Sequence, residues 1–227
     1  MTSEEVKKIA IQSGADICGI APGDRFNSAP EGFRPGDVYG KTVSVIVFAK
    51  RLPSEVLYAE SCIPYTRVNA LMAEEVDRLS LKISLELEDA GIKNVMIPSD
   101  DPFEYWEPDR HYGRGILSMR HAAELAGLGR LGKNNLLIND RFGNMLQIGA
   151  VLAAAPFEYD AVASYTVCPD GCRRCLDACP QGALDGRTVC QQECRPLSNF
   201  RTEKGYILKK CHQCRSACPH ATGIPAR

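Results

Sequence analysis

Apolar and polar positions alternate in a way that predicts helices and strands in turn along the N-terminal two thirds of the chain. Thr2 and Glu5 have the spacing of a capping box, and Val6 and Ile9 then share one helical face. Gly14 is a natural end for this helix. The chain is therefore expected to open with a short amphipathic helix.

The longest periodic segment runs from Thr66 to Ala90, where apolar residues recur at helical spacing. It predicts one long amphipathic helix ended by Gly91, and a shorter helix is expected over Met119–Leu125. The predicted strands, rich in apolar and β-branched residues, are Ala15–Ala21, Thr42–Ala49, Asn94–Pro98, Asn135–Ile138 and Met145–Ala153. Strands interleaved with helices favour an α/β or α+β sheet core.

A length of 227 residues suits one domain of moderate size followed by a small module. We place the boundary between residues 1–160 and residues 161–227. No stretch is long and apolar enough to span a membrane, and neither a signal peptide nor a twin-arginine leader is found, so we expect a cytoplasmic protein without a membrane partner.

Charge is unevenly divided, although the formal net charge is only -1. Residues 168–227 carry ten Lys and Arg against five Asp and Glu, and the remainder carries seventeen against twenty-three. A basic envelope suits an anionic metal cluster. The same face would also suit an acidic electron donor or an RNA backbone, and composition does not separate these partners.

Nine of the eleven cysteines lie in residues 168–227. They form two runs, Cys168-Pro-Asp-Gly-Cys172-Arg-Arg-Cys175-Leu-Asp-Ala-Cys179-Pro180 and Cys211-His-Gln-Cys214-Arg-Ser-Ala-Cys218-Pro219, with Cys190 and Cys194 between them. Both runs end in C-x-x-C-x-x-x-C-P, the ligand spacing of two-cluster bacterial ferredoxins. The chain is therefore expected to be a redox protein that moves single electrons.

In two-cluster ferredoxins the last cysteine of each run ligates the other cluster. One cluster is thus expected to take Cys168, Cys172, Cys175 and Cys218. The other is expected to take Cys179, Cys211, Cys214 and either Cys190 or Cys194. We favour Cys194, because its greater separation from Cys179 gives the chain more room to return. The three residues between Cys168 and Cys172, where two are usual, depart from the standard form.

Disulfides, zinc and a dithiol redox pair are the alternatives. Disulfides need an oxidising compartment, which nothing in the sequence suggests. Zinc has no need of the third close cysteine or of the Cys-Pro ending. Outside the two runs, Cys18 lies in a predicted strand and is expected to be a buried small hydrophobe, and Cys62 is left undecided.

The segment AGLGRLGKNN (residues 126–135) is dense in glycine. It matches G-x-G-x-x-G, but a helix precedes it and a strand follows, which reverses the order of a dinucleotide fingerprint. It also matches G-x-x-x-x-G-K, but Asn134 stands where a phosphate loop needs Ser or Thr. The remaining interpretation is a loop that ends a helix and uses glycine for a positive φ. Its high glycine content also suggests that another group approaches the backbone closely.

The succession HAAELAGLGRLGKNNLLI, FGNMLQIGAVL and two cysteine runs resembles epoxyqueuosine reductase and its relatives. The resemblance extends to the opening helix and the GADICGIA strand. It implies a nitroreductase-like, cobalamin-binding α/β domain shared with reductive dehalogenases, followed by a ferredoxin-like domain with two [4Fe–4S] clusters that feed electrons to cobalt.

The resemblance also implies functional residues. The glycine loop (residues 126–135) would belong to the corrinoid pocket, and its cofactor contacts would be Gly127, Leu128, Gly129, Gly132, Lys133 and Asn134. The implied cluster ligands are Cys168, Cys172, Cys175, Cys179, Cys194, Cys211, Cys214 and Cys218. Relatives often have Asn near position 190, which supports Cys194 as the eighth ligand.

The family carries an Asp as its proton donor shortly before the shorter helix, where this chain has Tyr112-Gly113-Arg114-Gly115. The chain also stops soon after Cys218, without the helical-repeat extension of many relatives. The polar, aromatic loop over residues 98–115 offers other donors, of which His111 and Tyr112 are favoured. His121 is expected to be a packing residue, and His212 and His220 to tune the clusters.

The favoured hypothesis is an oxidoreductase that passes single electrons through two [4Fe–4S] clusters to a site in the N-terminal domain, with cobalamin as a further candidate cofactor. A non-catalytic, ferredoxin-like electron-transfer protein is the alternative, and a tRNA-associated epoxyqueuosine-type reductase is a second one. The expected partners are an electron donor such as ferredoxin or flavodoxin and a small-molecule substrate, and tRNA is suggested by the resemblance but not favoured.

Overall fold

The computed structural model describes residues 1–225. Its α-helices are α1 (Ser3–Ser13), α2 (Pro35–Val38), α3 (Cys62–Asp89), α4 (Met119–Leu125), α5 (Arg174–Asp177), α6 (Gln191–Ser198) and α7 (Gln213–Ser216). Three short 3-10 helices are η1 (Gly23–Phe26), η2 (Ser54–Tyr58) and η3 (Pro108–Arg110).

The strands fall into one central sheet and three small hairpins. The sheet contains β1 (Ile17–Pro22), β2 (Ser44–Arg51), β3 (Asn94–Ile97) and β8 (Leu146–Ala153), in the order β1-β2-β8-β3. Every neighbouring pair in it is antiparallel. The hairpins pair β4 (Tyr105–Glu107) with β5 (Tyr112–Arg114), β6 (Arg130–Leu131) with β7 (Leu137–Ile138), and β9 (Phe200–Arg201) with β10 (Ile207–Leu208).

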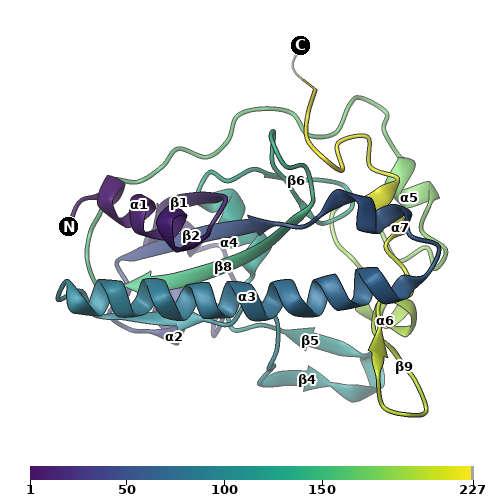
Figure 1. The fold of residues 1–227 in the computed structure, drawn as a ribbon, viewed down its shortest axis with the longest axis horizontal. Coiled ribbons are helices and arrows are strands. Elements are labelled where there is room, and N and C mark those ends of the chain that lie inside the picture. Colours follow the sequence, from purple (N-terminus) through teal and green to yellow (C-terminus); the bar gives the residue numbers. More distant parts are fainter. Residues whose placement is uncertain (226–227) are drawn as a thin grey trace.

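The sheet is covered on both faces, as Figure 1 shows, with α1 and the long α3 in front and α4 behind. Side chains on β2 alternate between the two covers. Ile46 and Phe48 pack with Val76 and Ile83 of α3 in one core cluster. Val45, Val47 and Ala49 pack in a second core cluster with Ala122, Ala123 and Ala126 of α4. This period of two explains why the central strands are apolar throughout.

The local features that the sequence predicts at the N-terminus are confirmed. Thr2 and Glu5 form the capping box, and Gly14 ends α1 at a φ of 119°. The long helix α3 starts four residues earlier than expected, and Gly91 follows its C-terminus at a φ of 78°. The mixed α/β class is therefore as predicted, with an antiparallel sheet at its centre.

Two segments differ from the expectation. The strand predicted over Asn135–Ile138 is confined to Leu137–Ile138, because Asn135 has a φ of 60° and its amide closes a turn onto Gly132. The segment expected as a loop over residues 98–115 contains the β4–β5 hairpin.

Within residues 1–225, no helix is both long enough and apolar enough to cross a membrane. The cysteine-rich segment, described over residues 168–225, contains the short helices α5, α6 and α7 and the β9–β10 hairpin. It packs at one end of α3, where Lys209 donates a backbone hydrogen bond to Oγ1 of Thr66 at 2.9 Å.

Candidate functional site

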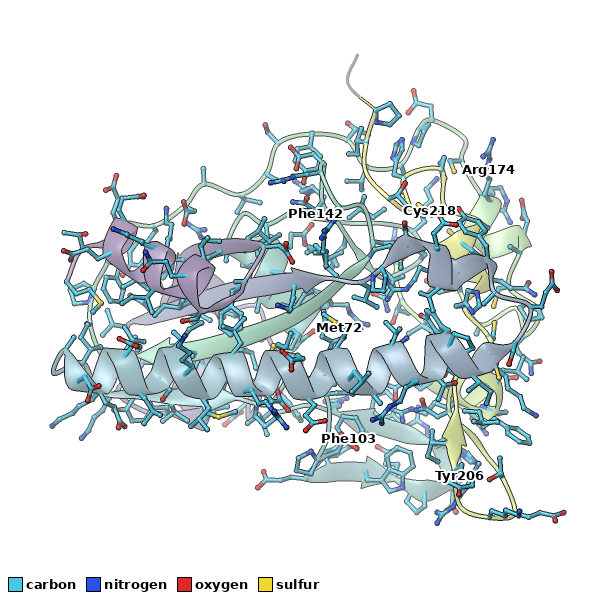
Figure 2. All side chains as sticks on the ribbon, viewed as in Figure 1. Met72, Phe103, Phe142, Arg174, Tyr206 and Cys218 are labelled. Carbon is cyan, nitrogen blue, oxygen red and sulfur yellow. The ribbon has the colours of Figure 1, made fainter. Side chains whose placement is uncertain are left out.

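A first group of cysteines comes together from both ends of the cysteine-rich segment. Cys168, Cys172, Cys175 and Cys218 line one small cavity. Burial raises the pKa of the Cys218 thiol, and the thiols of Cys168, Cys175 and Cys172 raise it further. Figure 2 shows Cys218 at the same end of the molecule as Arg174, the residue before Cys175. Residues 50 positions apart thus share one site, in the combination that the ferredoxin rule predicts.

A second group surrounds Cys214, which lies in the first turn of α7. Burial raises the pKa of the Cys214 thiol to about 11, while Arg215 lowers it and the thiols of Cys194, Cys211 and Cys179 raise it. Cys194 therefore lies with this group. Cys190 is exposed and stands at the N-cap of α6.

Residues of the glycine loop hold both groups in place. The backbone amide of Lys133 donates to Sγ of Cys168 at 3.4 Å, and its ammonium group donates to the carbonyl oxygen of Cys172 at 2.9 Å. The side-chain amide of Asn134 donates to the carbonyl oxygen of Cys214 at 3.2 Å. The loop that precedes β7 therefore packs against both cysteine runs and is hydrogen-bonded to each of them.

Every cysteine in the described part of the chain is a free thiol. Within residues 1–225, no three His, Cys, Asp or Glu side chains lie close enough together to hold a single metal ion. A cubane cluster is larger than one ion, so its four thiolates stand farther apart than the ligands of one zinc.

A cavity of about 830 Å³ lies between α4, β8, the segment that leads into α4, and the cysteine-rich segment. Its apolar walls include Phe26, Phe33 and Phe103, and its polar lining includes Asp100, Tyr112, Arg114, Arg120, His121 and Asn135. A cavity of this size with a few convergent polar groups is the usual form of a ligand site. It also adjoins the second cysteine group, because Arg215, next to Cys214, is part of its wall.

Three buried polar atoms on the cavity wall have no hydrogen-bond partner among residues 1–225: Nε of Arg120, Nδ2 of Asn135 and Oδ1 of Asn144. Buried polar groups are normally paired, since an unpaired one costs about 1–3 kcal/mol. Two unpaired donors and one unpaired acceptor on residues that line the same cavity therefore point to a polar ligand.

The β4–β5 hairpin forms one side of the cavity. The Nε–H of Arg114 donates to the phenolic oxygen of Tyr112 at 2.9 Å, and the guanidinium also lies 5.2 Å from the centre of the Tyr112 ring. Further contacts place Arg114 5.1 Å from the rings of both Phe33 and Tyr105. The predicted residue Tyr112 is thus fixed in the wall of the cavity.

His111 lies elsewhere. It occupies the turn of the hairpin, at a φ of 45°, and its side chain is exposed outside the cavity lining. His121, which the sequence assigns to packing, instead lines the cavity and shares a 2.7 Å hydrogen bond between Nδ1 and Oγ of Ser118. Burial and the charge of Arg120 lower the pKa of His121.

The glycines of the loop allow close approach by the backbone of this chain at Ala161 and Ile138. Gly127 has a φ of 80°, as expected of a glycine that ends a helix, and a Cβ there would collide with the carbonyl oxygen of Ala161. A Cβ on Gly129 would lie 2.5 Å from the carbonyl oxygen of Ile138. Leu128 is buried in the core. The predicted corrinoid contacts at Gly127, Leu128, Gly129, Gly132, Lys133 and Asn134 lie outside the described lining of the large cavity, so they stay a prediction.

The two remaining histidines contact backbone carbonyl groups beside the cysteine groups. His212 shares a 3.0 Å hydrogen bond between Nε2 and the carbonyl oxygen of Leu57, and its ring lies 4.4 Å from that of Tyr65. His220 shares one of 2.8 Å between Nδ1 and the carbonyl oxygen of Val167. Both side chains thus tether a cysteine run to the rest of the fold.

Sequence reasoning missed Arg120, Asn135 and Asn144 as residues of the site. Asn135 and Asn144 follow Asn134 and Gly143, and such positions read as turn residues. For Asn135 the one sequence signal was its place beside Asn134 at the end of the glycine loop, which turn chemistry explains equally well, and no sequence signal pointed to Arg120.

No model of a known protein family matches this sequence. Over 168 aligned residues the chain is 30% identical to the epoxyqueuosine reductase of Staphylococcus aureus, and the alignment covers 69% of this chain and 39% of that protein. A crystal structure of epoxyqueuosine reductase with an epoxyqueuosine-modified tRNA-Tyr stem loop matches with a TM-score of 0.65 at 21% identity, over 99% of this chain and 66% of that one.

A reductive dehalogenase whose structure suggests a mechanism for B12-dependent dehalogenation matches with a TM-score of 0.65 at 17% identity, over 95% of this chain and 31% of that one. The chain therefore spans well under half the length of the Staphylococcus aureus protein and about a third of the dehalogenase. The resemblance inferred from the sequence is confirmed: this chain is a relative of epoxyqueuosine reductases and shares its fold with them and with reductive dehalogenases.

Proposed function

We propose that this chain is an iron–sulfur reductase in which two [4Fe–4S] clusters, held by eight cysteines, pass single electrons to the large cavity. One observation carries the proposal: the eight free thiols gather in two groups of four, and the second group adjoins the cavity. In each group the thiols come from both cysteine runs, as two-cluster ferredoxins require.

The donor set fits iron–sulfur clusters. Burial and neighbouring thiols raise the pKa of Cys218 and Cys214, so without a metal the thiols resist ionising together. Positive iron would relieve this repulsion, since cysteine binds metals as thiolate. Lys133 and Arg215 place cations beside the two groups, which suits the negative charge of a thiolate-ligated cluster.

Cobalamin is the cofactor that we propose for the large cavity. The rim of a corrin carries many amide groups, and the unpartnered atoms of Arg120, Asn135 and Asn144 offer donors and an acceptor to such groups. Bound there, a cobalamin would supply the cobalt centre at which a substrate is reduced. Under this proposal residues 1–160 provide most of the cavity and residues 161–227 the clusters, with Gln191 and Arg215 of the second part completing the wall.

Tyr112 is the proposed proton donor. The Nε–H of Arg114 occupies a lone pair of the phenolic oxygen, so the phenolic proton is left to point elsewhere. Tyr112 lines the cavity, where a substrate that is being reduced would need a proton. His111, the other candidate from the sequence, is exposed in the hairpin turn, and Tyr112 is therefore the stronger candidate.

The cavity favours this proposal over a non-catalytic electron-transfer protein, which needs no ligand pocket beside its clusters. A tRNA-associated function stays the second candidate, because a related fold has been seen with a tRNA stem loop. Binding of a tRNA that weakens steeply with salt would support it, and no binding at low salt would dismiss it. The electron donor is proposed to be a small acidic protein such as ferredoxin or flavodoxin.

Anaerobic purification with iron, sulfide and absorbance analysis tests the main proposal. About eight irons and eight sulfides per chain are expected. Added cobalamin should be retained through gel filtration at one per chain, and Tyr112→Phe should retain both cofactors but lose most substrate turnover. Zinc in place of iron would overturn the proposal. Full iron without retained cobalamin would overturn the cofactor assignment and favour the electron-transfer protein.

A further inference from the structure

The side chain of Gln191 pairs with both backbone groups of Gly113. Its Oε1 accepts a hydrogen bond from the amide of Gly113 at 3.0 Å, and its Nε2 donates to the carbonyl oxygen of Gly113 at 2.9 Å. Two such bonds are what a residue exchanges with its partner on a neighbouring antiparallel strand. Gln191 therefore docks β5 onto the first turn of α6, which lies beside it in Figure 1.

Arg195 strengthens the same contact one turn further along α6. Its Nε–H donates to Oε1 of Gln191 at 2.9 Å, which fixes the orientation of the amide. Its guanidinium lies 5.0 Å from the ring of Trp106 and 5.4 Å from that of Phe103. A Cβ on Gly113 would stand only 3.0 Å from Trp106. The hairpin and the helix thus meet at close range through polar and aromatic contacts.

The two elements joined in this way belong to different parts of the site. Tyr112 and Arg114, on either side of Gly113, line the large cavity. Cys194, between Gln191 and Arg195 on α6, lies with the second cysteine group. A helix of eight residues therefore connects a cysteine thiol to the backbone that presents the cavity side chains.

We infer that Gln191 is a positioning residue that couples occupancy of the second cysteine group to the geometry of the cavity wall. The inference rests on the proposed function, in which Cys194 ligates iron. Iron held by Cys194 fixes α6, Gln191 then fixes Gly113, and the phenol of Tyr112 is kept in the wall. Loss of that iron frees α6 and, through Gln191, releases the hairpin.

Hydrogen exchange of the iron-loaded full chain, followed by mass spectrometry over residues 105–115, tests the contact. Gln191→Met, which removes both hydrogen bonds at similar length, should speed exchange there about tenfold. Gln191→Glu should lie in between, because a carboxylate still accepts from the Gly113 amide but cannot donate. The matched control is Gln192→Met, at an exposed neighbour on the same helix, which should exchange like the wild type.

Iron content and exchange in β8 should be the same in all four proteins, which separates a local effect from general loss of stability. Equal exchange of the hairpin in Gln191→Met and the wild type would overturn the inference.

A second pair of variants tests the coupling to iron. Cys194→Ala should lose about four irons per chain and speed exchange over residues 105–115, even though Gln191 is intact. Cys190→Ala, at the exposed N-cap of the same helix, should keep both iron and protection. Iron loss in Cys194→Ala with a protected hairpin would overturn the coupling and leave the proposed function standing. Full iron in Cys194→Ala would remove the ligand assignment and the coupling together.

Discussion

The backbone amide of Lys133 donates a hydrogen bond to Sγ of Cys168 at 3.4 Å. The ammonium group of the same lysine donates to the carbonyl oxygen of Cys172 at 2.9 Å, so the first cysteine group has a fixed cation beside it. The glycine loop thereby places the positive charge of Lys133 beside the first cysteine group. This charge has an electrostatic effect that can be measured.

Lys133→Met should make the cluster in the first group harder to reduce, because an added electron loses a nearby positive charge. A loss of about 1 kcal/mol corresponds to a midpoint potential lower by about 40 mV for one electron. A redox titration followed by electron paramagnetic resonance measures it. Lys133→Arg keeps the charge and should stay within a few millivolts of the wild type. An unchanged potential in Lys133→Met would show that the ammonium group does not act on the cluster.

Cys218→Ala and Cys175→Ala should lose the same cluster, although the two residues belong to different runs. Each variant should retain about four irons per chain, and the two should give matching spectra of the remaining cluster. Cys179→Ala should instead lose the cluster of the second group and retain the spectrum of the cluster in the first group. The expectation follows from the grouping of Cys218 with Cys168, Cys172 and Cys175. Different residual spectra from Cys218→Ala and Cys175→Ala would contradict that grouping.

Gly129→Ala should destabilise the protein by about 2 kcal/mol or more, because its Cβ would lie 2.5 Å from the carbonyl oxygen of Ile138 and 3.2 Å from Cγ of Leu137. Thermal unfolding of the iron-loaded protein measures the loss. Gly36→Ala, which meets nothing within 4 Å and lies in α2, is the control and should be neutral or slightly stabilising. Equal melting temperatures for Gly129→Ala and the wild type would mean that the loop can shift away from β7.

Asp100→Asn should become more stable relative to the wild type as pH rises. Burial raises the pKa of Asp100 above its value in the unfolded chain, with Lys209 and Arg195 acting in the opposite direction. The stabilisation from the neutral Asp100 carboxyl is fully present below the pKa of Asp100 in the unfolded chain, and it is lost as pH rises through the higher pKa in the folded protein. Asparagine does not titrate, so the variant does not lose stability in this way. Melting temperatures of the two proteins from pH 4.5 to 8 test this, and a pH-independent difference would contradict it.

Local rules predicted much of the sheet core from sequence. The capping box of Thr2 and Glu5 and the β-branched run in Thr42–Ala49 gave elements that the structure confirms, because their free energy comes from hydrogen bonds and burial within one segment. The spacing of the cysteines predicted that Cys218 joins Cys168, Cys172 and Cys175, which line one cavity together. The preference for Cys194 over Cys190 stays a prediction. The role of the cysteines as ligands stays a prediction as well.

The cavity could not be predicted in the same way, since its wall is assembled from segments far apart in the chain. The β4–β5 hairpin depends on Arg114 stacking with Phe33 and on Gln191 pairing with Gly113, contacts that no local pattern encodes. Asn144, which lines the cavity, is tied to Arg215 by two contacts: the Arg215 guanidinium donates to its backbone carbonyl, and its own side-chain amide donates to the carbonyl oxygen of Arg215 at 3.2 Å. Such cross-chain contacts become visible only in three dimensions.

Under the proposed function, the sharing of cysteines between the two runs also sets the point in translation at which the cluster sites become complete. A nascent chain that has not yet reached residue 211 contains neither group of four, because the first needs Cys218 and the second needs Cys211 and Cys214. The sheet core, whose last strand β8 ends at Ala153, is translated well before either group. Clusters bound as proposed could therefore be completed only after every strand of the central sheet has been translated.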